Sequence, residues 1–354
     1  MAVLNDEQEM LRDMAREWTK NEHPVGEWRK VRDAGEPFDA DAWGAMAEMG
    51  WAGIIIPEEH GGSDFGWMSL GLVVEELGKS LAASPLIASA LAASAIVLGG
   101  SDEQKAEYLP RLASGELIGT LAFDEGPRHI GLKASAGVHD GRLTGTKAFV
   151  HEASRAGLFV VLASDGVYLV EQGQGVTLSS RALADMRDHA EIDFNDAPAQ
   201  KLAAGGDDLA QKILDRARVL TAAEMLGMCQ AVFDTTLDYL KQRVQFNQVL
   251  SSFQALQHRM ADLYSELEMT RSAVEGGLQA LDSGVAVTEA AMLAKTRAND
   301  ALHLISKEGI QLHGGIGMTD EYNVGFYLKR ARVLEAAWGA SSHLRDLYAT
   351  TKGY

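Results

Sequence analysis

The segment Gln311-Leu-His-Gly-Gly-Ile-Gly-Met-Thr-Asp-Glu-Tyr322 is the stretch from which most can be inferred about the fold of this chain. Its paired glycines, Gly314 and Gly315, allow a backbone to approach a bound ligand closely because they have no side chain. Gln311 supplies both a hydrogen-bond donor and an acceptor. Taken alone, the two glycines are equally typical of a turn that ends a helix. The segment therefore predicts a ligand contact only in combination with other elements.

Two such elements lie earlier in the chain, Arg243-Val-Gln-Phe246 and Phe253-Gln254. The guanidinium of Arg243 offers a fork of donors that suits phosphate oxygens. A dinucleotide presents a pyrophosphate, which needs such donors, and a planar ring, which needs apolar walls. The alternative for Arg243 is an ordinary solvated arginine on the surface.

The composition is that of an acidic globular protein. Fifty acidic against 32 basic residues leave a formal charge of -18, so neither nucleic acid nor a membrane surface is an expected partner.

The one cysteine, Cys229, has no partner in the chain, and the acidic N-terminus lacks the regions of a signal peptide. Both features predict a reducing, cytoplasmic location. The uncharged stretch 80–100 contains Pro85 and several serines, so we expect a helix buried in protein rather than a membrane span.

Hydrophobic periodicity divides the chain into three regions. Residues 1–119 carry apolar stripes at spacings of three and four, which indicate helices. Residues 120–205 contain short β-type runs, with Asp140-Gly141 as a hairpin signal. Residues 206–354 return to helices, and two long ones are expected over Asp207–Arg243 and from Ser251 to about Leu281. The sequence predicts a mostly α protein with a central antiparallel β domain and a C-terminal helical bundle.

Several common site classes lack their sequence signals. No GxGxxG follows a predicted strand, which argues against a Rossmann cofactor domain. The histidines do not have the clustered spacing of a metal site, and no Gly-x-Ser-x-Gly element indicates a hydrolase. We therefore expect no metal centre.

The chain resembles the acyl-CoA dehydrogenase family over nearly its whole length. The resemblance rests on the order of the elements at 243–246, 253–254 and 311–315, which follow a helical region and a β region. The resemblance extends to Asp6-Glu-Gln-Glu-Met-Leu-Arg12, Gly50-Trp-Ala-Gly-Ile-Ile-Ile-Pro57 and Glu75-Glu-Leu-Gly78. It implies an N-terminal helical domain, a β domain and a C-terminal four-helix bundle that makes the oligomer. It also implies FAD as the cofactor and an acyl-CoA thioester as the substrate.

The resemblance implies which residues meet the flavin. In the family, the Arg-x-x-Phe and Gln-x-x-Gly-Gly elements reach FAD that is bound mainly by a neighbouring subunit. The positions that take this role by analogy are Arg243, Phe246, Phe253, Gln254, Gln311, Gly314 and Gly315.

The β-domain half of the flavin site departs from the family pattern. The usual Thr-Glu-Pro-x-x-Gly-Ser-Asp loop is replaced by Asp124-Glu-Gly-Pro-Arg-His-Ile130, which lacks the serine and the aspartate. The usual Trp-Ile-Thr or Trp-Ile-Ser segment aligns with Phe149-Val-His151. Phe149 can still pack against a ring and His151 can still donate a hydrogen bond. The alternative for His151 is a surface histidine at the end of a strand.

The catalytic base of the family is also missing. Oxidation of a thioester needs an acceptor for the proton beside the carbonyl, usually a carboxylate. The usual glutamate position is Trp338, and indole cannot accept this proton. Some relatives carry the glutamate on the long helix, where this chain has Ala217. The neighbours Asp215 and Arg218 match residues that line the thioester channel in relatives, although an ordinary pair on a helix explains them equally well.

Three other carboxylates are candidates for the base. Glu224 lies in an apolar stretch, where a buried glutamate signals either a structural ion pair or a functional group. Glu335 precedes Trp338 by one helical turn, and Glu125 lies in the altered loop.

Three functions follow from these departures. In the first, the chain is the subunit of an α2β2 acyl-CoA dehydrogenase, for fatty acid or sterol side-chain degradation, that contributes flavin contacts to a homologous partner. In the second, a self-sufficient homo-oligomer uses Glu224 or Asp215 as a relocated base. In the third, the chain is a non-catalytic acyl-CoA-binding scaffold. An electron-transferring flavoprotein is the electron acceptor that the resemblance suggests.

Overall fold

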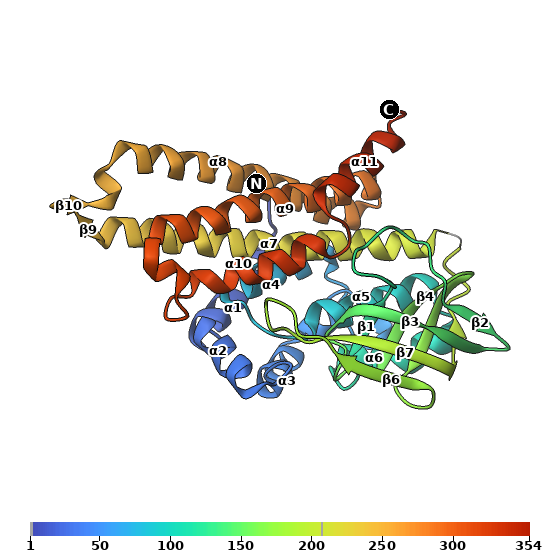
Figure 1. Cartoon of the computed structure of the whole chain (residues 1–354). Helices are drawn as coiled ribbons and strands as arrows, with labels where there is room; N and C mark the ends of the chain where they lie inside the picture. Colours follow the sequence, from blue (N-terminus) through green and yellow to red (C-terminus); the bar gives the residue numbers. More distant parts are fainter. Residues whose placement is uncertain (1–2, 207) are drawn as a thin grey trace. The chain divides into compact units, whose positions relative to one another are not determined.

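The computed structural model describes residues 3–206 and 208–354 (Figure 1). Contacts between Cα atoms divide the chain into two compact units. Unit 1 comprises Met1–Trp28, Gly71–Ala82 and Arg218–Tyr354, and unit 2 comprises Arg29–Leu70 and Ala83–Ala217. The N-terminal helical region therefore contributes to both units.

The N-terminal region forms six helices in the described residues. Their bounds are α1 Asp6–Asn21, α2 Val25–Ala34, α3 Ala40–Glu48, α4 Gly66–Ser80, α5 Leu86–Gly99 and α6 Asp102–Ala113. Helix α6 begins with a capping box, in which the hydroxyl of Ser101 accepts from the Gln104 amide and the Gln104 side chain accepts from the Ser101 amide. Two short 3₁₀ turns, Trp51–Gly53 and Glu58–His60, lie between α3 and α4.

The uncharged stretch 80–100 contains α5, which begins directly after Pro85. Most of its residues are buried, including Leu86, Leu91 and Ile96. Among the described residues, no helix combines the length and the apolar character that a bilayer crossing requires.

Unit 2 contains two four-stranded sheets. One has the strand order β1-β4-β5-β8 and the other β2-β3-β7-β6. The strand bounds are β1 Gly119–Ala122, β2 Gly137–His139, β3 Arg142–His151, β4 Leu158–Ala163, β5 Gly166–Glu171, β6 Val176–Ser180, β7 His189–Pro198 and β8 Gln200–Lys201. All pairs are antiparallel except β1 with β4. A core that includes Phe159, Val161 and Phe194 fills this domain.

The predicted hairpin at Asp140-Gly141 is confirmed. His139 pairs with Arg142, which leaves a two-residue loop between β2 and β3. Both loop residues have positive φ, 48° and 72°. This is the backbone of a type I′ turn, for which an Asp-Gly pair is well suited.

The C-terminal region consists of five helices in the described residues, α7 Leu209–Gln242, α8 Gln254–Ser283, α9 Val287–His313, α10 Val324–Ala336 and α11 Ser341–Thr351. Helices α7 to α10 run side by side within unit 1 (Figure 1). The two long predicted helices correspond to α7 and α8, and the predicted first residue Asp207 lies outside the described residues. A small hairpin of β9 Val244–Gln245 and β10 Gln248–Val249 connects them, followed by a 3₁₀ turn over Leu250–Ser252.

Helices α4 and α7 meet at their backbones within unit 1. A Cβ atom built on Gly227 would lie 1.9 Å from the carbonyl oxygen of Glu75, and one built on Gly78 would lie 2.3 Å from that of Glu224. Only glycine permits this approach. The architecture is mostly α with a central, largely antiparallel β domain and a C-terminal helical bundle, as the sequence predicts.

Candidate functional site

The predicted cofactor contacts gather where α7 ends and α9 ends, both in unit 1. Arg243 follows α7, and Gly314 follows α9 and begins a 3₁₀ turn over Gly314–Met318. The ring of Tyr239, one turn before Arg243, lies 4.4 Å from the ring of His313, which precedes Gly314. The two elements therefore lie close together although they are far apart in sequence.

Phe246 and Asn247 form the two-residue loop of the β9–β10 hairpin. Their φ angles are 53° and 63°, in the left-handed region. This conformation is costly for a bulky aromatic residue, and it places Phe246 at the tip of the hairpin with 85% of its surface exposed. Its ring meets the ring of Phe253 edge to face, with the ring centroids 6.2 Å apart.

The polar groups at this end are available to a ligand. Arg243, Gln254 and Gln311 are exposed, and within the described residues their side chains make no hydrogen bond or ion pair. No atom within 4 Å would obstruct a Cβ at Gly314 or Gly315. An unpaired guanidinium, two free amides and an open glycine corner are suited to an anionic dinucleotide that approaches from outside the chain.

Trp338, the predicted position of the family glutamate, lies in a tightly held turn between α10 and α11. Trp338 is buried with a φ of 58°, and Nε of Arg218 donates to its carbonyl oxygen at 3.0 Å. The next carbonyl, that of Gly339, accepts from the amide of Asn299 at 3.3 Å. The turn is therefore fixed by side chains from α7 and α9, but it presents an indole ring.

Lys295 lies beneath this turn and is completely buried. Its Nζ donates to the side-chain oxygen of Asn299 at 2.5 Å and to the carbonyl of Leu334 at 2.9 Å. Burial, and secondarily the nearby charge of Arg218, lower the pKa of Lys295 to about 7. No sequence motif singles out this residue, although a lysine directly after the apolar run Ala290–Ala294 is a signal for a buried cation.

The two parts of the candidate site in unit 1 lie far apart along α7. Arg218 lies in the first third of the helix, and Arg243 directly follows its last residue. The separation of about 25 residues corresponds to about 37 Å along an α-helix. One flavin cannot touch both places within one subunit.

The candidate relocated bases are engaged in protein contacts. Both carboxylate oxygens of Glu224 accept from Arg330, at 2.9 and 3.2 Å, and both side chains are buried. Asp215 is buried on α7 and accepts from the amide of Gln211 at 2.8 Å. Ala217, at the alternative base position, is buried in the same helix. Glu335 accepts from Arg332 at 2.9 Å.

In unit 2, Glu125 is held by four donors. They are the amide of Ser135 at 2.7 Å, the hydroxyl of Ser135 at 2.6 Å, the amide of Ala136 at 2.9 Å and Nζ of Lys147 at 2.7 Å. Burial opposes ionisation, but these bonds together lower the pKa of Glu125 to about 2. Nearby, Nδ1 of His129 lies 2.8 Å from the carboxylate of Asp124. The altered loop therefore uses both of its carboxylates in protein contacts.

Phe149 and His151 lie at the end of β3, beyond a register shift between Lys147 and Val150. Phe149 has a φ of 52°. Nδ1 of His189 lies 3.1 Å from the carbonyl of Arg187, and its Nε2 lies 3.2 Å from Nδ1 of His151. Since a carbonyl only accepts, a neutral His189 carries its proton on Nδ1 and accepts from His151. Neutral His151 therefore has a lone pair on Nε2, unlike the hydroxyl donor that the family places here.

Three of the predicted site residues share a rare backbone conformation. Phe149, Phe246 and Trp338 are bulky aromatics with φ between 52° and 58°. Such residues tolerate the left-handed region only where the surrounding structure holds them, and these conformations concentrate at functional sites. No sequence signal, such as a glycine, predicts these three turns.

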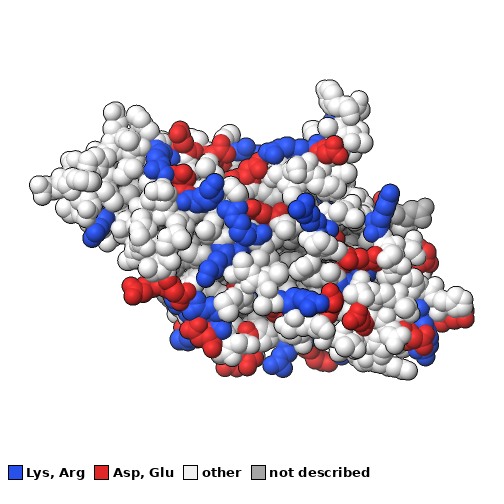
Figure 2. Space-filling model, viewed as in Figure 1, with Lys and Arg blue, Asp and Glu red and all other residues white. Residues whose placement is uncertain are grey.

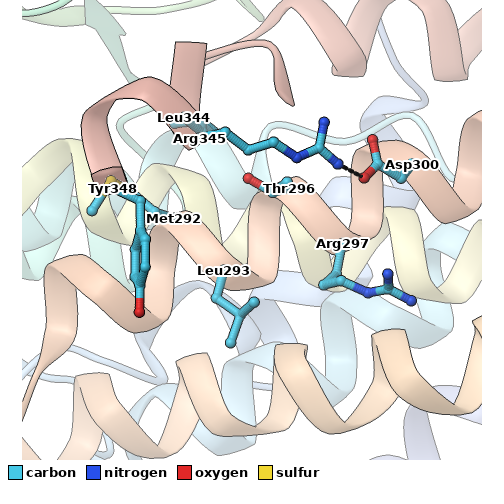
Figure 3. A pocket seen from close by; sticks show the side chains of 8 residues that line it. All are labelled: Met292, Leu293, Thr296, Arg297, Asp300, Leu344, Arg345 and Tyr348. Carbon is cyan, nitrogen blue, oxygen red and sulfur yellow. Dashed lines mark hydrogen bonds and ion pairs between the residues drawn. The ribbon is translucent and has the colours of Figure 1, made fainter. Parts of the chain in front are cut away.

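Two other surface features lie on the C-terminal helices. Basic and acidic side chains lie next to each other over α8 to α10 (Figure 2), as in the pairs Arg259–Glu308 and Arg297–Glu266. A hollow of about 340 Å³ lies between α9 and α11, where Arg345 reaches Asp300 beside the apolar residues Leu293 and Tyr348 (Figure 3). Across residues 3–206 and 208–354, no group of His, Cys, Asp or Glu could hold a metal ion.

Comparison with known proteins gives two family-model matches. Residues 5–116 match the model "Acyl-CoA dehydrogenase, N-terminal domain", and residues 204–352 match "Acyl-CoA dehydrogenase, C-terminal domain". The chain is 32% identical to the probable acyl-CoA dehydrogenase YngJ of Bacillus subtilis, over 98% of each protein.

Solved structures share the fold over nearly the full length. A variant of the Tcur3481-Tcur3483 steroid ACAD matches with a TM-score of 0.91 and 28% identity, over 98% of this chain and 97% of that one. The ChsE4-ChsE5 complex from Mycobacterium tuberculosis matches with a TM-score of 0.91 and 25% identity, over 100% of both chains. The second of these structures is a complex of two proteins, ChsE4 and ChsE5.

Proposed function

The chain belongs to the acyl-CoA dehydrogenase family, and we propose that it is a subunit that completes the flavin site of a homologous partner and supplies no catalytic base. Members of this family are FAD-dependent flavoproteins. The reaction that we propose for the assembly is the α,β-desaturation of an acyl-CoA thioester.

The observation that carries this proposal is the separation of the two half-sites along α7. Arg243 lies about 37 Å along α7 from Arg218, which contacts Trp338 at the predicted base position. The hydroxyl of Tyr239 donates to the carbonyl of His313 and so holds the Gly314–Gly315 corner near Arg243. This separation supports a contact from Arg243 and this corner to a flavin that belongs to a neighbouring subunit rather than to one at their own subunit's base position. The side chains of Arg243 and Gln311 are exposed and unpaired in the described part of the chain, as such a contact requires.

The absence of a usable carboxylate supports the second half of the proposal. Trp338 occupies the predicted base position, and the carboxylate of Glu224 forms a buried ion pair with Arg330. The carboxylate of Glu125, in the altered loop, accepts four hydrogen bonds from other residues of the protein. A proton from the substrate therefore has no acceptor among these carboxylates, and we assign the base to the partner.

The residues at the end of α7 fit FAD as follows. Arg243 would pair with phosphate oxygens, Gln254 and Gln311 would give directed hydrogen bonds, and Gly314–Gly315 would allow a close backbone approach. Phe246 and Phe253 would provide apolar contact area. When bound, FAD supplies the acceptor for the hydride that leaves the acyl chain.

The partner that we propose is a homologous acyl-CoA dehydrogenase subunit with an intact base and flavin loop. The likeness to the ChsE4-ChsE5 complex supports a hetero-oligomer over a homo-oligomer. An electron-transferring flavoprotein is the acceptor that we propose for the electrons of the reduced flavin.

The test compares two charge-removing variants of this chain in the FAD-containing complex. Arg243→Ala should weaken FAD binding about 10- to 100-fold, because it removes a charge-assisted contact to phosphate. Lys241→Ala removes the same charge from an exposed position two residues earlier and should leave FAD affinity unchanged. Equal FAD affinity in all three complexes would contradict the proposed contact.

A further inference from the structure

A compact aromatic group joins the two cofactor-contact elements of unit 1. His313 lies between Tyr239 and Tyr322, with ring centroids 4.4 Å and 4.8 Å away and interplanar angles of 30° and 50°. The rings of Tyr239 and Tyr322 meet edge to face at 6.0 Å. His313 is 3% exposed. The three rings therefore form one packed cluster, which we call the Tyr239–His313–Tyr322 cluster.

The imidazole of His313 is fixed in this cluster. Its Nδ1 lies 2.7 Å from the carbonyl oxygen of Gly309, so Nδ1 carries the proton. Its Nε2 is buried and makes no hydrogen bond to any described residue. Burial lowers the pKa of His313, so the ring is neutral at neutral pH. The ring of His313 therefore packs against its neighbours and has no contact with solvent through Nε2.

The cluster connects directly to both predicted contact elements. The Arg243 amide donates to the carbonyl of Tyr239 at 2.9 Å, and the Leu250 amide donates to the carbonyl of Arg243 at 2.8 Å. On the other side, the hydroxyl of Tyr239 donates to the carbonyl of His313 at 3.2 Å, directly before Gly314. The side chain of Tyr239 thus links the last turn of α7 to the last residue of α9.

We propose that His313 is a positioning residue for the cofactor: through the cluster it fixes the spacing between the Arg243 guanidinium and the Gly314–Gly315 corner. This inference rests on the proposed function, since it takes these two elements as contacts to one dinucleotide. A dinucleotide bound by two elements gains affinity only when their separation matches the ligand in advance.

The first experiment measures FAD affinity in the complex with the homologous subunit. His313→Leu removes the imidazole ring from the cluster together with its hydrogen bond to Gly309, and it should weaken FAD binding about tenfold. Tyr239→Phe keeps the ring and removes only the bond to the carbonyl of His313, so it should weaken binding by a smaller factor. Tyr322→Phe is the matched control, because within the described residues its hydroxyl makes no hydrogen bond, and it should bind FAD as the unmodified chain does.

A double-mutant cycle separates positioning from general destabilisation. If His313 acts by placing its neighbours, Arg243→Ala combined with His313→Leu should weaken FAD binding by less than the product of the two single effects. A purely structural histidine would lower the unfolding temperature and leave FAD affinity unchanged, and that result would overturn the inference. The inference would also be overturned if the double variant weakened FAD binding by the full product of the two single factors.

A second readout needs no cofactor. In the isolated full chain, His313→Leu should speed amide hydrogen exchange both at 243–249 and at 314–318, while exchange in α8 stays unchanged. Faster exchange at only one of the two elements would contradict the coupling. If instead Arg243→Ala leaves FAD affinity intact while exchange responds as expected, the coupling stands and the proposed function fails.

Discussion

The Nε atom of Arg218 donates to the carbonyl oxygen of Trp338 across 3.0 Å, and both residues are buried. Their contact joins α7 to the turn between α10 and α11, which corresponds to the predicted place of the family glutamate. The turn keeps a left-handed backbone at Trp338 and a second support from Asn299. The turn at Trp338 is therefore fixed by buried side chains, and it carries an indole rather than a carboxylate.

Replacing Arg218 tests how much this turn contributes to stability. Arg218→Met should lower the free energy of unfolding by about 2–3 kcal/mol, because the buried carbonyl of Trp338 loses a charged donor. Arg345→Met removes an exposed arginine that pairs with Asp300, and it should cost less than about 1 kcal/mol. Denaturant unfolding of both variants measures the difference, and equal losses would show that the Arg218 contact has no special weight.

Glu224 provides the direct test of a relocated base. Glu224→Gln leaves the Arg330 guanidinium buried beside a neutral amide, so we expect a loss of about 3–5 kcal/mol in unfolding free energy. In the complex, the folded fraction should still transfer electrons from acyl-CoA to the flavin, which bleaching of the flavin absorbance reports. A variant of normal stability that no longer bleaches would identify Glu224 as the base instead.

Lys295 predicts a specific dependence of stability on pH. Its pKa falls from an ordinary value of 10.5 to about 7 in the folded protein. Between these values the unfolded chain binds a proton that the folded chain does not, so the free energy of unfolding rises with pH, by up to about 1.4 kcal/mol per unit. Denaturation at pH 7 and pH 9 should show this rise in the unmodified protein and not in Lys295→Met. Parallel pH profiles would mean that Lys295 is charged when folded.

Two glycine substitutions test the contact between α4 and α7. Gly227→Ala would place a Cβ atom 1.9 Å from the backbone oxygen of Glu75 and should destabilise the protein by about 2–3 kcal/mol. Gly276→Ala, in the interior of α8, has no atom within 4 Å of the new Cβ and should stabilise it by about 1 kcal/mol. Thermal unfolding gives both values, and a harmless Gly227→Ala would contradict the close backbone contact.

The features that the sequence predicts are those with a local signal. The extents of α7 and α8 follow from long helical periodicity between breakers, and the β2–β3 hairpin follows from Asp140-Gly141. The β9–β10 hairpin has no such signal. Both loop residues have a positive φ, for which glycine or asparagine is usual, but the first of them is Phe246. Periodicity therefore missed it, and only the family resemblance drew attention to Phe246.

The candidate site depends on contacts that no local pattern contains. Residue type shows that Trp338 cannot act as a base, but the support from Arg218 joins residues separated by 120 positions. Likewise, an apolar stretch predicts a partner for Glu224 without showing that it is Arg330. The division of the site between two distant parts of α7 became visible only when the helix was known to be continuous.

The most direct test of the account is the FAD content of the purified chain, alone and with a homologous subunit, measured by visible absorption after gel filtration. We predict that the chain alone carries no stoichiometric flavin, and that the complex holds one FAD for each partner subunit and loses it when Arg243 is replaced by alanine. One tightly bound FAD per chain in the isolated protein, bleached by an acyl-CoA, would contradict the central claim.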